Sequence, residues 1–250
     1  NAFGYQALTA NTSGASNNAF GKSALDANTT GSSNTAMGHN TLGANTTASN
    51  NTGFGYQVLA NNTTGANNVA VGYAALDSNT TGTDNIGIGG FTLDANTTGS
   101  SLTAIGYAAL NANTTASHNV AVGKSALELN TTGEQNVAVG NFALDANTTG
   151  TLNVAVGYGA VGANSTGANN TGIGRNALGS VTTAESNTAV GMNALYTNTG
   201  SHNTAVGNEA LVNNTTAEHN VAVGRTALKL TTTGGLNCAL GSSALENNTT

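Results

Sequence analysis

A single glycine recurs along this chain at an almost constant interval, and this repeat limits the fold more than any other feature. The interval is 17 residues, except for one of 16 residues between Gly191 and Gly207. The fifteen glycines are Gly4, Gly21, Gly38, Gly55, Gly72, Gly89, Gly106, Gly123, Gly140, Gly157, Gly174, Gly191, Gly207, Gly224 and Gly241. We number each repeat from this glycine, as position 0, and call the residues that share a position a row. Repeats this short cannot bury a core alone, so neighbouring repeats must stack.

Apolar and turn-forming residues follow one another within each repeat in an order typical of β structure. In the repeat of Gly72, the alternating apolar run 69–71 predicts a strand, and residues 74–76 predict a second short strand or bend. The Asn-Thr-Thr-Gly stretch at 79–82 then predicts a turn, because these residue types favour turns and disfavour helices. We therefore predict an all-β, parallel β-solenoid (β-roll) of about fifteen 17-residue coils, stacked about 4.8 Å apart. The one-residue deletion falls between Leu195 and Asn203, in the predicted turn.

The repeat covers the whole chain. We expect residues 1–250 to form a single repeat array, a window of a longer fibre that continues at both ends, because no capping repeat is evident. Charged residues are only 6% of the chain and the net charge is −6, which argues against a nucleic-acid partner. No apolar run is long enough to span a membrane.

Catalytic and metal-binding residues are not expected, and neither is a cofactor. His118, His202 and His219 share row −5, but a metal needs several converging ligands and these residues lie in repeats that are not all neighbours. No set of nucleophile, base and acid recurs, so we expect the protein not to be an enzyme. The single cysteine, Cys238, replaces a β-branched residue in row −3, and we expect its thiol to be buried.

The two faces of the predicted strand differ in side-chain size. Val69 and Val71 point one way, whereas Ala70 and Gly72 point the other way, and rows −2 and 0 hold only Ala or Gly. Close packing against both faces would explain this restriction, with a neighbouring chain as the cover for one of them. A flat single-chain roll whose two walls approach closely is the alternative. The candidate close-packing interface consists of Ala70, Gly72, Ala121, Gly123, Ala138, Gly140, Ala155 and Gly157.

Asparagine fills two rows. Row −4 is Asn in nearly every repeat, with Leu102 as the exception, and we predict a hydrogen-bonded side-chain ladder there. Row +7 carries the Asn-x-Ser/Thr pattern of N-glycosylation acceptors, on what we expect to be an exposed row. Plain turns and side-chain ladders would explain the same residues without a glycan. The candidate acceptors are Asn11, Asn28, Asn45, Asn62, Asn79, Asn96, Asn113, Asn130, Asn147, Asn164, Asn214 and Asn248.

Threonine doublets follow these asparagines and raise the alternative of a binding module. A flat, regular Thr face could order water, so a carbohydrate- or ice-binding β-solenoid is the second functional hypothesis. Thr80 and Thr81 argue against it, because an extended doublet in a turn would point its two side chains to opposite faces.

The string Asn67-Asn68-Val69-Ala70-Val71-Gly72 resembles the Asn-Ser-Val-Ala-Ile-Gly motif of trimeric autotransporter adhesin heads. Similar strings recur at 136–140 and 220–224, and the unit also resembles repeats of phage tail-fibre-like proteins. The adhesin resemblance implies a left-handed parallel β-roll, three chains side by side, on the outside of a cell. The chain departs from that family in its repeat, which is longer than usual, and in its Asn-Thr-Thr-Gly turn.

From these observations we predict a structural segment of an extracellular fibre or adhesin, at a cell or virion surface. Its partners would be other copies of the chain in a homo-oligomer, which the adhesin resemblance implies to be a trimer. Cell-surface or environmental glycans are further candidate partners. The mechanism would be mechanical, because stacked backbone hydrogen bonds and a continuous core make a stiff rod.

Overall fold

The computed structural model describes residues 1–249, which form short β-strands and turns and no helix. The chain divides into two compact units, Asn1–Ser125 and Ala126–Thr250. The first unit contains β1 (Ala2–Phe3), β2 (Asn18–Phe20), β3 (Thr35–Met37), β4 (Thr52–Phe54), β5 (Val69–Val71), β6 (Ile86–Ile88), β7 (Thr103–Ile105) and β8 (Val120–Val122). The second contains β9 (Val137–Val139), β10 (Val154–Val156), β11 (Thr171–Ile173), β12 (Thr188–Val190), β13 (Thr204–Val206), β14 (Val221–Val223) and β15 (Cys238–Leu240). None of the described residues forms a helix that could cross a membrane.

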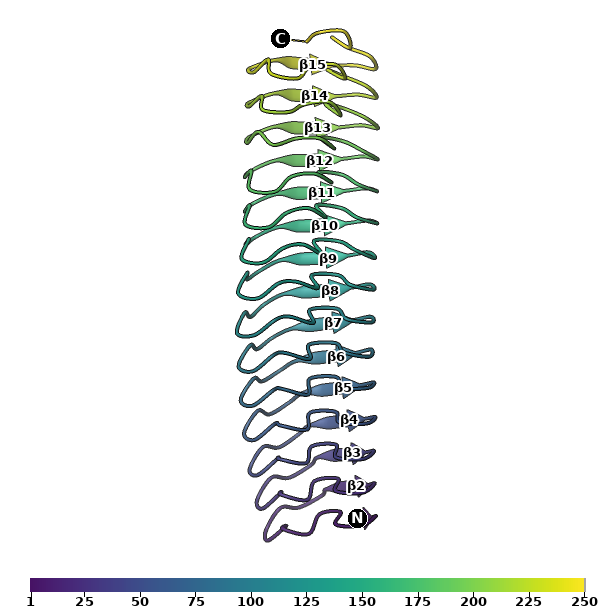
Figure 1. The fold of residues 1–250 in the computed structure, drawn as a ribbon, viewed down its shortest axis with the longest axis vertical. Helices are drawn as coiled ribbons and strands as arrows, with labels where there is room; N and C mark the ends of the chain where they lie inside the picture. Colours follow the sequence, from purple (N-terminus) through teal and green to yellow (C-terminus); the bar gives the residue numbers. More distant parts are fainter. Residues whose placement is uncertain (250) are drawn as a thin grey trace. The chain divides into compact units, whose positions relative to one another are not determined.

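Each repeat contributes one strand, and within each unit the strands pair in parallel and in sequence order (Figure 1). The pairing keeps every row in register: Val69 lies opposite Ile86, and Val71 opposite Ile88. Each strand is only two or three residues long, and the rest of the coil consists of turns. The predicted all-β parallel solenoid is therefore confirmed.

The 16-residue interval leaves the strand register intact, since Thr188 of β12 still pairs with Thr204 of β13. In the first coil, the N–H groups of Thr12, Ser13 and Gly14 all donate to the carbonyl oxygen of Thr29. In the shortened coil, only the N–H groups of Thr199 and Gly200 donate to the equivalent oxygen of Thr215. The missing residue therefore belongs to row +9, in the turn, as the sequence predicted.

Residues in the left-handed backbone region bend each coil. Gly72 has φ 136°, and a Cβ there would overlap the carbonyl group of Gly89 in the next coil. Three non-glycine rows are also left-handed, as in Ala74 (φ 51°), Leu76 (φ 54°) and Asp84 (φ 59°). Such a conformation costs about 1–3 kcal/mol. In row +4, complete burial of the leucine side chain contributes about 1.5–3 kcal/mol, which offsets this cost.

The interior of each coil is narrow and consists of alanine, leucine and asparagine. In the coil of β5, Ala70, Ala75 and Leu76 are fully buried, together with the asparagines Asn68 and Asn79. The middle residue of each strand points inward and its two neighbours point outward. The space between the walls admits only a methyl group from the strand, so larger side chains are excluded from row −2.

This arrangement corrects the expected role of the small residues. The expected interface alanines are each fully buried within their own chain: Ala70, Ala121, Ala138 and Ala155. The glycines of row 0 pack against the next coil, since a Cβ on Gly72, Gly140 or Gly157 would overlap the following row 0 glycine. Gly123 has the same left-handed conformation, with φ 135°. The small residues are therefore required by close packing within one chain, where the walls of a coil and successive coils approach each other. The alanines are buried and are not available to a second chain.

Candidate functional site

In each unit, the outer face of the strands carries exposed apolar side chains. We call rows −3 and −1 the outward strand rows. Row −1 is large and apolar in every repeat: Phe3, Phe20, Met37, Phe54, Val71, Ile88, Ile105 and Val122 in the first unit, and Val139, Val156, Ile173, Val190, Val206, Val223 and Leu240 in the second. The structure places these side chains on the outer surface of the strands.

The outward strand rows expose a substantial part of each side chain to solvent. Val71 is 36% exposed, Ile88 39% and Ile105 38%, and Phe20 reaches 52%. Across the eight strands of the first unit, the face covers about 400 Å², from a spacing of about 4.8 Å and a length of about 10 Å per strand. Row −1 supplies the continuous apolar part of this face, whereas row −3 of the first unit is Asn or Thr in five of the eight repeats. Exposed apolar surface of this order commonly marks an interaction site.

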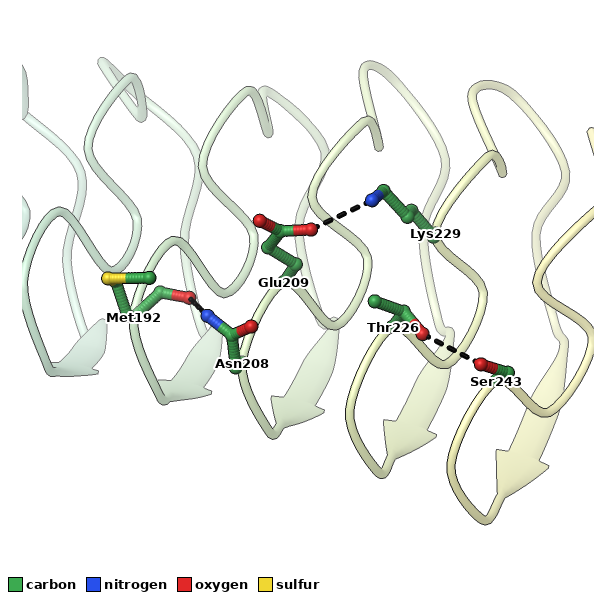
Figure 2. Close-up of polar contacts among 6 residues, drawn as sticks. All are labelled: Met192, Asn208, Glu209, Thr226, Lys229 and Ser243. Atoms are coloured by element: carbon green, nitrogen blue, oxygen red, sulfur yellow. Dashed lines mark hydrogen bonds and ion pairs between the residues drawn. The ribbon is translucent and has the colours of Figure 1, made fainter.

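No charged residue interrupts the outward strand rows in any repeat. Charged residues lie instead in rows on the turns, and Figure 2 shows such a group in the second unit. Lys229 Nζ lies 2.8 Å from Glu209 Oε2 of the preceding coil. This hydrogen bond and the charge of Lys229 lower the pKa of Glu209. Between neighbouring turns, the hydroxyl groups of Thr226 and Ser243 also share a hydrogen bond of 3.0 Å.

Aromatic side chains form a second surface feature, on the turn that follows the strands of the first unit. The rings of Tyr56 and Tyr73 stack with centroids 5.5 Å apart, and His39 stacks on Tyr56 at 5.1 Å. Phe91 meets Tyr73 edge-on at 5.0 Å. These contacts join the rings of successive coils, while Tyr56 and Tyr73 remain exposed.

The expected glycosylation row lies inside the coil. Ten of the twelve candidate asparagines are fully buried, namely Asn28, Asn45, Asn62, Asn79, Asn96, Asn113, Asn130, Asn147, Asn164 and Asn214. The other two, Asn11 and Asn248, are half-buried in the first and last coils. A glycan is bulky and needs a surface position. The expectation of an exposed acceptor row is therefore wrong for the buried ten.

Row +7 instead forms a buried ladder of side-chain amides. Asn79 Nδ2 donates to Asn62 Oδ1 at 2.8 Å and to the Gly82 carbonyl oxygen at 3.0 Å. Asn79 Oδ1 in turn accepts a hydrogen bond from Asn96 Nδ2 at 2.8 Å. Each amide thus links two coils and closes its own turn, so a residue without both a donor and an acceptor interrupts the ladder.

Row −4 forms the second ladder, as the sequence predicted. Asn68 Oδ1 accepts the backbone N–H of Asn85 at 3.0 Å, and Asn68 Nδ2 donates to the Gly82 carbonyl oxygen at 2.9 Å. Leu102 breaks the row and is buried, and its backbone N–H still donates to Asn85 Oδ1. The row therefore has a structural role between coils.

The row +7 ladder is interrupted where Val181 and Thr231 replace asparagine. Both residues are fully buried, like the asparagines they replace. The asparagine before each break, Asn164 or Asn214, has a buried Oδ1 atom with no hydrogen-bond partner among the described residues. A buried acceptor without a donor costs about 1–3 kcal/mol.

Replacing Val181 with asparagine is therefore expected to stabilise the chain. The new Nδ2 would donate to Asn164 Oδ1, and the free energy of unfolding should rise by about 1 kcal/mol. Urea denaturation of the purified chain measures this change. The matched control is Val181→Asp, which has nearly the same size but no donor, and which should destabilise the chain. A Val181→Asn protein less stable than the wild type would show that the ladder geometry does not extend through this coil.

Two carboxylates of row +5 lie in adjacent coils, Asp77 and Asp94. Burial raises the pKa of both, and the charge of Asp94 raises the pKa of Asp77 further. Asp77 Oδ1 also has no hydrogen-bond partner. The charged form of Asp77 is therefore the less favourable one in the folded chain.

The stability of the chain should depend on pH through this pair. Because the folded state holds the Asp77 and Asp94 protons more tightly than the unfolded state, their contribution is complete below the unfolded pKa of about 3.9 and is lost as the pH rises through the folded pKa. Asp77→Asn should raise the melting temperature at about pH 7 and flatten its change between about pH 3 and pH 7. Asp26→Asn is the control, since the row +5 residue of its next coil is Gly43. If Asp77→Asn and Asp26→Asn changed the melting temperature equally, the charge of Asp94 would not be acting on Asp77.

The remaining candidates are scattered. Cys238 is exposed on the outward strand rows, so the expectation of a buried thiol is wrong. His202 and His219 stack with centroids 5.0 Å apart on the exposed row −5. Within the described part of the chain, no three His, Cys, Asp or Glu side chains are placed to hold a metal ion.

Comparison of the chain with protein-family models, curated proteins and solved structures finds no match. The fold and the surface geometry are therefore the grounds on which a function can be argued.

Proposed function

We propose that this chain is a structural segment of an extracellular fibre or adhesin, in which copies of the chain associate side by side through the outward strand rows. The observation that carries the proposal is the unbroken, uncharged row of large apolar side chains on the outside of the strands, exemplified by Val71, Ile88 and Ile105. A surface of this kind is unfavourable in water and favours association.

The magnitude of the effect depends on repetition. Covering the exposed part of one row −1 side chain would contribute roughly 0.5–1 kcal/mol. Association costs about 4–15 kcal/mol in lost freedom, so one or two coils would not hold a partner. The first unit has eight such strands and the second has seven, so within one unit the contributions of both partners together reach the size of this cost. The stability of the assembly would thus come from the same repetition as the fold.

A second copy of the chain is the partner that fits best. The outward strand rows repeat about every 4.8 Å, and a partner must match this spacing along its length to bury each side chain. Another copy has the same spacing by construction. The resemblance of the Asn67–Gly72 string to adhesin heads suggests three copies side by side, and it also suggests the location outside a cell.

The native mass of the purified chain tests this proposal. We expect a complex of three times the 24.4 kDa chain mass in native mass spectrometry and in sedimentation at micromolar concentration. A complex of twice the chain mass would support side-by-side association but contradict an assembly of three copies. A single-chain mass at every concentration would overturn the association itself.

A further inference from the structure

Row +9 is an exposed row of threonines. In the first unit it consists of Thr30, Thr47, Thr64, Thr81, Thr98 and Thr115, preceded by Ser13. All six threonines are exposed, and their hydroxyl groups make no hydrogen bond within the described chain. We call these six residues the threonine row.

The preceding threonine of each doublet behaves differently. Thr80 is half-buried, and its hydroxyl donates to the Thr97 carbonyl oxygen of the next coil at 3.0 Å. The side chain of row +8 therefore contributes to coil stacking, whereas Thr81 in row +9 contacts the next coil only through its backbone N–H, which donates to the Thr97 carbonyl oxygen at 3.2 Å. Each doublet therefore has one hydroxyl that bonds to the next coil and one hydroxyl without a partner. A regular face of threonines needs only the second hydroxyl of each doublet, so the opposite directions of the two side chains are no objection to it.

The uniformity of the threonine row has no structural explanation. Rows −2, −4, 0, +4 and +7 are uniform because they are buried or sharply bent. Other exposed rows vary: row +1 holds Tyr73, Lys124, Asn141 and Met192. The shortened coil lacks row +9 altogether and still keeps its strand register and its Asn ladder, with Asn214 Nδ2 on Asn198 Oδ1. The fold thus tolerates the loss of this threonine, yet row +9 is Thr in every other complete repeat except the first.

A second row of hydroxyls lies two residues further along the same turn. Ser32, Ser49, Thr83, Ser100 and Ser117 occupy row +11 of the first unit, in which no charged residue occurs. Ser100 Oγ accepts the backbone N–H of Thr83 at 3.0 Å, and its O–H group donates to the Thr98 carbonyl oxygen at 3.4 Å, so this row is tied to the turn more closely than the threonine row. The first unit therefore presents the threonine row and, beside it in sequence, an uncharged row of hydroxyl groups that alanine interrupts at Ala15 and Ala66.

We infer that the threonine row and its neighbouring hydroxyl row form a binding surface for ice. A row that offers one hydroxyl and one methyl group about every 4.8 Å needs a ligand with a similar repeat, and the surface of an ice crystal has such a repeat of uncharged donors and acceptors. Water anchored on the free hydroxyls would be continuous with the lattice, and the methyl groups would be covered. The surface lies on the turns and not on the outward strand rows, so the inference does not rest on association of copies.

The experiment compares ice growth in solutions of the whole chain and of a charged variant. The wild-type chain should hold a single ice crystal without growth over a measurable interval below its melting temperature. Thr64→Lys, Thr81→Lys and Thr98→Lys together should abolish this interval, since ammonium groups disrupt the uncharged row. Should that variant fail to fold by circular dichroism, Thr→Ala at the same three positions removes the hydroxyls without adding charge and should also abolish the interval.

The control variant carries the same added charge on another row. Tyr56→Lys, Tyr73→Lys and Tyr107→Lys place three lysines on row +1, where Lys22 and Lys124 already occur, and should keep the interval. Growth of the ice crystal in the wild-type solution at every temperature below the melting temperature of ice would overturn the inference, as would a folded threonine-row variant that still arrests growth. Binding to cellulose or chitin powder that the threonine-row substitutions remove, without any effect on ice, would overturn it in favour of a polysaccharide ligand.

Discussion

Replacing Asn79 with alanine is expected to lower the free energy of unfolding by about 3 kcal/mol. The substitution leaves Asn62 Oδ1 without its donor and removes one acceptor from Asn96 Nδ2, both inside the coil. It also deletes the bond from Asn79 to the Gly82 carbonyl oxygen. Urea denaturation followed by circular dichroism measures the change.

The neighbouring residue provides the control for this prediction. Asn61 is exposed and lies in row +6, which is alanine in other repeats, as in Ala27 and Ala95. Asn61→Ala should change the free energy of unfolding by less than about 0.5 kcal/mol, as is usual for a surface position. If the two substitutions cost the same, the buried ladder is not what holds neighbouring coils together.

The second large effect concerns association and not folding. Val71→Glu combined with Ile88→Glu is expected to reduce the native mass to that of a single chain, because two carboxylates would have to lose their water against an apolar partner face. In the separated chain both side chains face solvent, so the circular dichroism spectrum should stay unchanged.

The control for this second prediction places the same charge outside the outward strand rows. Tyr56→Glu combined with Tyr73→Glu adds two carboxylates to row +1, on the turn. The native mass of this variant should equal that of the wild-type assembly. A strand-row variant that keeps the mass of the wild-type assembly would show that the contact between copies lies elsewhere.

The repeat interval of the sequence was enough to predict the coil, the parallel pairing and the row −4 ladder. It was not enough to decide which strand face points inward. Hydrophobicity alone favours Val71 over Ala70 as a core residue, whereas the width of the coil interior, which only the three-dimensional structure defines, admits the methyl group of Ala70 and excludes the larger side chain.

The range of residue types within each row nevertheless indicates whether that row is exposed or buried. Row −1 accepts Phe54, Met37 and Val71 alike, which is typical of a surface, whereas row −2 accepts only alanine or glycine. Row +7 gave a similar signal, because Val181 and Thr231 replace asparagine with buried residues of similar size. The free and the structural threonines of each doublet could not be separated in this way, since both rows are threonine and only the backbone bend distinguishes them.

The most direct test of the account is a comparison of thiol alkylation rates on the two faces of β5, in a Cys238→Ser background. Val71→Cys should react much faster than Ala70→Cys when the protein is dilute, and more slowly as the concentration rises and copies cover the outward strand rows. Ala70→Cys should stay protected at every concentration, because this position is fully buried within one chain. Protection of Val71→Cys together with rapid reaction of Ala70→Cys in the dilute protein would contradict the orientation of the strands and the proposed interface with it.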